Sequence, residues 1–117
     1  MTLPYQGGVR RYVKAVLSMK ALDVVVLDVR GLASFADTFI ICSGRSHRQV
    51  SAIGEFVEKE LKRKGMKPLG VEGLRQGHWV LMDYGDVVIH VFYEPIRTFF
   101  DLEGLWSDAR RIEISEA

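Results

Sequence analysis

The chain has 117 residues, of which 48% are hydrophobic and 26% charged, and its formal net charge at pH 7 is +1. This length suffices for one domain with a hydrophobic core, and a mean hydropathy of +0.06 is typical of a globular protein. With a net charge of +1, the whole molecule has no nucleic-acid-binding signature. No apolar run approaches the ~20 residues that span a bilayer, and the N-terminus lacks the apolar core of a signal peptide. We therefore predict a cytoplasmic protein with no membrane partner.

Charges are unevenly distributed along the chain, and cysteine is scarce. Residues 1–67 contain 12 Lys and Arg against 6 Asp and Glu, whereas residues 68–117 contain 4 against 9. This asymmetry predicts a molecule with a basic side and an acidic side. The single cysteine, Cys42, excludes an internal disulfide and indicates a reducing compartment. No Cys/His cluster has the spacing of metal ligands, so we predict no metal site.

The first part of the chain predicts a helix followed by two strands. Apolar residues recur at helical spacing from Val9 to about Lys20, with basic residues between them. The β-branched runs 22–29 and 38–42 follow, and both have the near-continuous apolar pattern of strands buried on both faces.

A second helix is predicted after Ser46. Ser46 and Gln49 form a capping box, because the serine can accept a first-turn N–H and the glutamine can reach back to the cap. Basic residues crowd the last turns, where the helix dipole favours cations, and Gly65 suits the C′ position. The predicted buried stripe consists of Val50, Ile53, Val57 and Leu61.

A β-hairpin is predicted next. A short strand within 66–72 leads into two apolar-rich runs, 78–83 and 86–93, which flank Tyr84-Gly85. A short Gly-containing break between such runs is a hairpin signal. If the loop is these two residues, the cross-strand pairs are Asp83 with Asp86, Leu81 with Val88 and Trp79 with His90.

Alternation along this hairpin separates two faces. One is core material and carries Val80, Met82, Val87, Ile89 and Val91. The other carries Trp79, Leu81, Val88 and Phe92 together with His90, Asp83 and Asp86. An aromatic anchor beside acidic groups is typical of a recognition surface, which a basic partner would stabilise at the turn. The alternative is that a helical layer covers this face and the aspartates cap the turn.

The chain after the hairpin predicts one short helix and a polar end. Pro95 disfavours helix in the residue before it and suits a first helical position. Apolar residues that can pack this helix on the sheet are Ile96, Phe99, Phe100, Leu105 and Trp106. Residues 110–117 are polar and are expected to be loosely held. The predicted organisation is a flexible N-terminus (1–8), one domain (9–106) and a polar tail (107–117).

No catalytic constellation is evident. Cys42 follows a strongly apolar run, so we expect it to be buried and unreactive. His90 could act as a base, but no serine or cysteine is placed to be its partner. Asp83 and Asp86 could bind a metal, yet further ligands are not identified. The glycines follow neither dinucleotide-binding nor P-loop spacing. We predict no catalytic residue and no cofactor.

Several segments in this order and spacing resemble the ribosomal silencing factor family, also called iojap. They are Asp37-Thr38-Phe39-Ile40-Ile41-Cys42-Ser43-Gly44, the Ser46 to Gln49 helix start, the run 68–73, the run from Trp79 to Val91, and Arg97 with the run from Phe99 to Trp106. The resemblance extends from Val9 to Trp106. It implies a small α/β (α+β) domain with a mixed sheet of about five strands and helices packed on it, similar to the nucleotidyltransferase fold but without its catalysis.

The resemblance also implies a function. Family members bind the large ribosomal subunit through the ribosomal protein numbered fourteen, keep the small subunit off, and lower translation when nutrients are scarce. Free members are commonly homodimers, and no sequence-specific nucleic acid is implied. The contact region carried over to this chain consists of Trp79, Asp83 and Tyr84, with Gly85 and Asp86 beside them.

The sequence departs from the family pattern at two places, and two alternatives to the implied function remain open. Phe100 stands where many relatives have tyrosine, and Ser43-Gly44 is followed by Arg45-Ser46-His47 without the paired acids of nucleotidyltransferases. A residual nucleotidyltransferase-like enzyme is the alternative to a binding factor. Direct RNA binding, through the basic residues of the first helix and the 59–67 cluster, would show a steep salt dependence.

Overall fold

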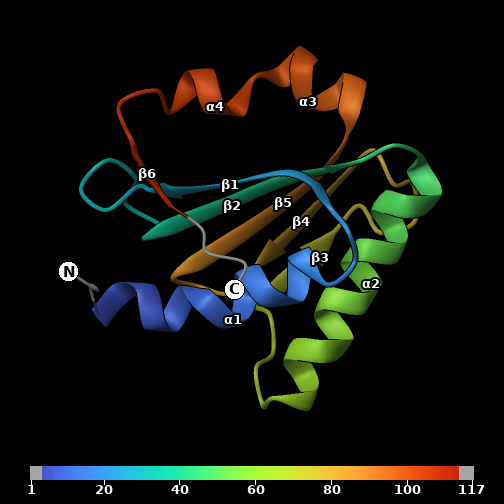
Figure 1. The fold of residues 1–117 in the computed structure, drawn as a ribbon, viewed down its shortest axis with the longest axis horizontal. Coiled ribbons are helices and arrows are strands. Elements are labelled where there is room, and N and C mark those ends of the chain that lie inside the picture. Colours follow the sequence, from blue (N-terminus) through green and yellow to red (C-terminus); the bar gives the residue numbers. More distant parts are fainter. Residues whose placement is uncertain (1–3, 114–117) are drawn as a thin grey trace.

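The computed structural model describes residues 4–113, which form a mixed sheet between two helical layers. Figure 1 shows α1 and α2 on one face of the sheet and α3 and α4 on the other. The helices are α1 Pro4–Leu17, α2 His47–Arg63, α3 Glu94–Phe100 and α4 Leu102–Leu105. The strands are β1 Leu22–Asp28, β2 Thr38–Gly44, β3 Gly70–Glu72, β4 Trp79–Asp83, β5 Val87–Tyr93 and β6 Arg110–Ile112. No helix within residues 4–113 is long and apolar enough to cross a bilayer.

The sheet has the strand order β3-β4-β5-β2-β1-β6, with six strands instead of the predicted five. The central pair, β2 and β5, is parallel, and every other pair is antiparallel. Helix α2 lies in the connection from β2 towards the hairpin. The α/β class predicted from the resemblance is therefore confirmed, with one additional edge strand.

The two faces of the sheet each carry a hydrophobic cluster. Between the sheet and α1 and α2 lie residues such as Val16, Ile53 and Met82, all fully buried. On the other face, Phe39 and Phe92 are buried beneath α3, α4 and the segment after β1. The central strands are apolar on both sides for this reason, as the predicted pattern of β2 indicated. The prediction is wrong for much of β1, whose first residues are only partly buried and include a bulge between Leu22 and Val25.

The β4–β5 hairpin is present, but its register differs from the predicted one. Asp83 pairs with Val88, and the Tyr84 N–H donates to the Val87 carbonyl at 2.9 Å, so the turn residues are Gly85 and Asp86. Gly85 has φ +88°, a conformation that suits glycine at the first position of such a turn. The observed pairs are Trp79 with Phe92 and Leu81 with His90. Because the register shift is two residues, the side chains of both strands stay on their predicted faces, whereas Asp86 belongs to the turn instead of a strand.

Helix α2 forms as predicted, with one correction. Ser46 accepts the Gln49 N–H at 3.0 Å, but the Gln49 side chain accepts the N–H of Arg45 at 2.7 Å rather than that of Ser46. At the C-terminus, Gly65 has φ +84°, and the Met66 N–H donates to the Leu61 carbonyl at 2.9 Å. This is a Schellman end, which satisfies the last carbonyls of the helix. The predicted stripe Val50, Ile53, Val57 and Leu61 is buried.

Regular secondary structure extends beyond both predicted ends of the domain. Helix α1 begins at Pro4 and ends at Leu17, so residues 4–8 of the expected flexible N-terminus are helical. Proline suits this start because a first-turn N–H has no helical partner. At the other end, β6 lies inside the predicted tail and pairs with β1 through Val26 and Ile112. Residues 1–3 and 114–117 lie outside the described residues.

The predicted third helix is two short helices. Asp101 adopts a left-handed conformation with φ 46°, which ends α3, and its carboxylate accepts the Gly104 N–H at 3.2 Å, which caps α4. The break rotates part of the predicted apolar surface outwards. Phe99 and Leu105 are 80% and 76% exposed and do not pack on the sheet, contrary to the prediction. Ile96 and Trp106 do pack there.

Candidate functional site

Trp79 is partly exposed at the start of β4, on the face that α3 and α4 cover. Its ring packs on Phe92 and Phe100, with ring centroids 4.7 and 5.1 Å away. The indole N–H donates to Nδ1 of His90 at 3.1 Å. These contacts hold the indole in one orientation and leave part of its surface available. Helices cover the centre of this face, as the alternative interpretation predicted, and Trp79 lies at its margin, where a role in recognition stays a prediction.

His90 is the hydrogen-bond acceptor of the indole. It is 5% exposed, and burial lowers the pKa of its imidazole to about 4, so the ring is neutral near pH 7. Because Nδ1 accepts the Trp79 N–H, the ring proton is on Nε2. Nε2 is buried and has no hydrogen-bond partner within residues 4–113. The hydrogen bond to Trp79 is therefore the polar contact that positions His90, and it occupies the nitrogen that a general base would use.

The hairpin turn presents two aspartates in different roles. The Asp83 carboxylate accepts the Gly85 N–H at 2.8 Å and so caps the turn from inside. Asp86 is exposed, and its carbonyl accepts the N–H groups of Asp37 and Thr38, which ties the turn to the start of β2. The two aspartates are not cross-strand partners, contrary to the predicted pairing, so their like charges do not lie directly opposite each other, an arrangement that would destabilise the hairpin. Of these two aspartates, Asp86 is the more exposed and hence the more available to a partner.

Tyr84 lies on the other face of the sheet from Trp79. Its ring packs on Tyr12 of α1 with centroids 5.3 Å apart. The hydroxyl oxygen is buried without a hydrogen-bond partner in the described part of the chain, and burial, with a smaller contribution from Glu58, raises the Tyr84 pKa to about 12. The ring is only partly buried, so its edge can still contribute to the turn surface.

The five predicted site residues therefore form two adjoining parts. Trp79 and Asp83 share one side of β4, whereas Tyr84 is on the other side, and Gly85 and Asp86 form the tip between them. Sequence reasoning did not include three neighbours of Trp79 and Asp83 in the site. They are Leu81, which lies between them on the same face, Glu72, its partner in β3, and Phe100, which contacts the indole. Alternation along β4 had already placed Leu81 on this face, but only tertiary structure brings Phe100 there.

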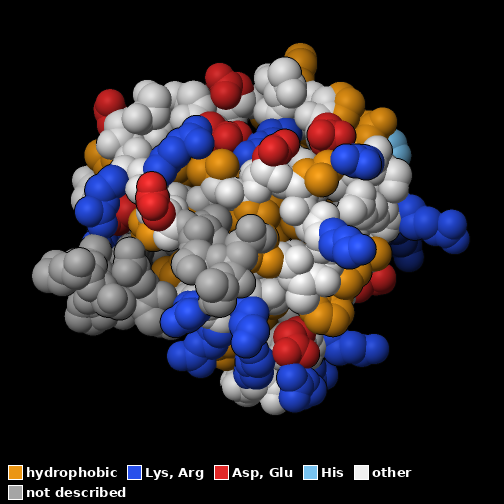
Figure 2. All heavy atoms as spheres, viewed as in Figure 1, with side chains coloured by type: hydrophobic (Ala, Val, Ile, Leu, Met, Phe, Trp, Pro, Cys, Tyr) orange, Lys and Arg blue, Asp and Glu red, His pale blue; other side chains and the backbone are white. Residues whose placement is uncertain are grey.

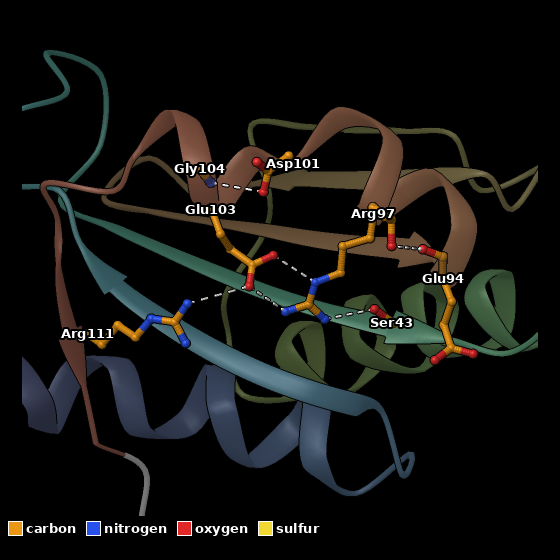
Figure 3. Close-up of polar contacts among 8 residues, drawn as sticks. Ser43, Glu94, Arg97, Asp101, Glu103, Gly104 and Arg111 are labelled. Atoms are coloured by element: carbon orange, nitrogen blue, oxygen red, sulfur yellow. Dashed lines mark hydrogen bonds and ion pairs between the residues drawn. The ribbon is translucent and has the colours of Figure 1, made fainter.

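A second polar cluster lies at the end of β2, in the position relevant to the enzymatic alternative. An open cleft of about 800 Å³ is bounded by β1, β2, β6 and the α3–α4 segment. Figure 3 shows the guanidinium of Arg97 between Ser43 and Glu103 at this cleft. Arg97 donates to the Ser43 hydroxyl at 2.8 Å and to both carboxylate oxygens of Glu103 at 2.9 and 3.1 Å.

This cluster has the contacts of a structural clamp. Arg97 is 9% exposed, and its guanidinium lowers the pKa of Glu103, to which Arg111 also comes within 3.9 Å. Ser43 is buried and already bonded. Within residues 4–113 no three His, Cys, Asp or Glu side chains are grouped so as to hold a metal ion. Cys42 is fully buried as predicted, and burial raises its pKa to about 12.

Sequence comparison relates the chain to named proteins. The family model for "Ribosomal silencing factor during starvation" matches residues 5–117. The chain is 43% identical over 102 residues to ribosomal silencing factor RsfS of Halalkalibacterium halodurans, covering 87% of each protein. It is 41% identical over 90 residues to the RsfS of Bacillus subtilis, covering 77% of this chain and 76% of that one. It is also 37% identical over 101 residues to the chloroplastic protein Iojap of Arabidopsis thaliana, covering 86% of this chain and 42% of the plant protein.

Solved structures agree with this relationship. A crystal structure from Chromobacterium violaceum superposes with a TM-score of 0.85 at 33% identity, covering 98% of this chain and 95% of that one. A second, from Bacillus halodurans, superposes with a TM-score of 0.83 at 38% identity, covering 93% and 99%. The matched family model and these identities extend over nearly all of the described fold, including the hairpin that carries Trp79. The chain belongs to the ribosomal silencing factor family.

Proposed function

We propose that this protein represses translation by binding the large ribosomal subunit, through the ribosomal protein numbered fourteen, and by blocking the small subunit from joining. The names of its relatives support a ribosome-silencing role. The structural observation that carries the proposal is the partly exposed Trp79, held between Phe92, Phe100 and His90 and followed along β4 by an acidic turn. The repressor acts stoichiometrically, when nutrients are limiting, in the cytoplasm.

The proposed contact divides into an anchor and a charged rim. A fixed aromatic side chain loses little conformational freedom when it is buried, and such anchors often cost ~2 kcal/mol or more when truncated at interfaces. Ribosomal proteins are typically basic, so Asp86 at the exposed tip attracts the partner before contact. Trp79 and Leu81 then hold it, while Tyr84 and Gly85 keep the turn in shape.

Binding to purified large subunits tests this division. Trp79→Ala is expected to weaken binding at least ~30-fold, mainly through faster dissociation. Trp79→Phe keeps most of the packing and should be intermediate. Asp86→Asn should slow association at low salt and change little at high salt, because exposed charges are screened. Sedimentation and stopped-flow mixing measure the two effects.

Trp106→Ala is the matched control for stability. Trp106 packs against Phe39 on the same face of the sheet, with ring centroids 5.2 Å apart, and is not part of the proposed contact. Circular-dichroism melts accompany every variant. If Trp106→Ala lowers the melting temperature and the affinity for large subunits as much as Trp79→Ala does, the anchor role of Trp79 is wrong.

Inhibition of translation should follow the fraction of large subunits that carry the protein. Translation in a purified system is expected to fall in proportion to the large subunits occupied, with preassembled ribosomes much less affected. The enzymatic alternative predicts turnover of labelled nucleoside triphosphates with Mg²⁺ that scales with the protein and is lost in Asp83→Asn or Asp86→Asn. Observing such turnover would contradict a purely stoichiometric repressor.

A further inference from the structure

One surface of the molecule is basic, and the proposed contact leaves it unused. In α1 the buried side chains include Val9, Val13 and Val16. The opposite side of the helix exposes Arg10, Arg11 and Lys14, and α1 contains no acidic residue. No ion pair joins these three side chains to another described residue. The helix therefore presents uncompensated positive charge to solvent.

The C-terminal end of α2 extends this surface. The exposed cations here are Lys59, Lys62, Arg63, Lys64 and Lys67. Glu60 pairs with Arg63 at 2.8 Å and lies 3.8 Å from Lys64, so two of the cations are partly neutralised. Helices α1 and α2 pack against each other. Figure 2 shows Lys and Arg side chains gathered over α1 and this end of α2. We call the surface formed by Arg10, Arg11, Lys14 and these five residues the basic face.

The basic face adjoins the hairpin turn. Tyr12 of α1 packs on Tyr84, and the Leu69 N–H, just beyond Lys67, donates to the Asp83 carbonyl at 2.7 Å. When a partner binds the hairpin turn, the basic face therefore lies close to the molecules that surround the partner's binding surface. In the large subunit, a ribosomal protein is surrounded chiefly by RNA.

We infer that the basic face binds the phosphate backbone of ribosomal RNA next to the docked turn. This inference rests on the proposed function and adds a second contact to it. Clustered exposed Lys and Arg neutralise phosphates, and contacts of this kind position a protein without reading sequence. An anionic membrane fits less well, because among residues 8–113 the exposed large hydrophobic residues all lie outside α1 and α2.

Matched charge removal tests the inference. One triple variant of the full chain, Arg10→Gln/Lys14→Gln/Lys62→Gln, removes three charges from the basic face. A second, Arg45→Gln/Arg48→Gln/Arg75→Gln, removes three exposed charges near the N-terminal end of α2. Both sets use glutamine, which is well tolerated in helices. Binding to purified large subunits and to a short RNA hairpin labelled with fluorescein is measured between about 50 and 300 mM salt.

The basic-face variant should bind subunits at least tenfold more weakly at low salt, and its plot of log K against log salt should be shallower by about 2. It should also lose binding to the RNA hairpin, while the control variant keeps both. Equal salt slopes for the two variants would overturn the inference, as would a loss of binding to phosphatidylserine vesicles without a loss to RNA.

The failure of either proposal is recognisable. If Trp79→Ala abolishes subunit binding while the basic-face variant binds with the wild-type salt slope, the inference is wrong and the proposed function stands. If wild-type protein does not bind subunits but binds the RNA hairpin through the basic face, the proposed function is wrong, whereas RNA backbone binding by the basic face is supported.

Discussion

His90 is an uncommon choice for the centre of a buried strand. Its imidazole makes one hydrogen bond, to the Trp79 indole, and leaves Nε2 buried without a partner among the described residues. A buried polar group without a partner typically costs about 1–3 kcal/mol. An apolar residue would avoid this cost but would release the indole N–H. His90 therefore lowers the stability of the fold but fixes the orientation of the Trp79 indole.

The depressed pKa of His90 predicts a specific pH dependence. In the unfolded chain this histidine titrates near 6.5, whereas in the fold its pKa is about 4, so between these values the unfolded state binds more protons. Stability should fall as pH is lowered from about 6.5 to 4, by on the order of 3 kcal/mol from this group. Urea titrations of wild type and His90→Asn measure it.

In His90→Asn the amide oxygen can still accept the indole N–H, but nothing titrates. The variant should lack this part of the pH dependence and should keep subunit binding, whereas His90→Leu should lack the pH dependence and bind more weakly. If all three proteins lose stability in parallel between pH 6.5 and 4, the assignment to His90 is wrong.

Residue-level prediction from sequence succeeded where alternation decides the outcome. Alternation correctly placed Trp79 and Asp83 together, apart from the core side of the hairpin. It could not show that Tyr84 packs on α1, because the contact joins Tyr84 to Tyr12 across most of the chain. Trp79 and His90 were predicted to lie directly opposite each other, but they are diagonal neighbours joined by a hydrogen bond, because the turn residues are Gly85 and Asp86.

At the scale of elements, the α3–α4 segment depends on one ion pair. Arg97 of α3 bonds to Glu103 of α4 and to Ser43 of β2, so the same guanidinium joins both helices to the sheet. Both side chains are largely buried, at 10% and 21% exposure. A bidentate pair of this kind specifies geometry as well as charge compensation. Phe100 lies between the two helices and Trp79, so the clamp also supports the indole.

Arg97→Met should destabilise the fold by about 2 kcal/mol, because Glu103 and Ser43 lose their donor while part of the carboxylate remains solvated. Arg97→Lys should recover little, since an ammonium cannot bond to both oxygens in the same way. Amide hydrogen exchange should accelerate first in α3 and α4. Exchange that accelerates uniformly, or not at all, would show that the pair is not a local clamp.

The elements that sequence predicted well are those whose signals are local. Helix α2 carries its own cap, stripe and terminal glycine, and all three are observed with small corrections. Strand β6 has three residues, of which two are arginines, and it exists because β1 offers an open edge. The break at Asp101 likewise depends on a left-handed backbone conformation, which the neighbouring residues in the sequence do not predict.

Over the whole molecule, exposed apolar surface is concentrated away from the basic face. Phe99 and Leu105 are largely exposed on the α3–α4 side, and Phe99 packs on Phe100, which contacts Trp79. Large exposed apolar patches on small domains usually mark interfaces. We expect a homodimer in the free protein that uses this surface and covers part of the docking side.

Light scattering should report a dimer for wild type at high micromolar concentration, and Phe99→Ser/Leu105→Ser should shift it towards monomer. Leu69→Ser is the matched control, since Leu69 is 78% exposed but lies beside the hairpin turn. A wild-type monomer at that concentration would count against the dimer. A monomer produced by Leu69→Ser alone would place the interface at the turn.

Both edges of the sheet end in strands of three residues, β3 and β6. A neighbouring copy that tried to continue the sheet would find few free backbone groups at either margin, and at β6 it would meet two arginine side chains. Edge-to-edge stacking, which can turn open sheets into fibres, is therefore weak here. Copies that associate would therefore meet through a face of the molecule instead of along a sheet edge.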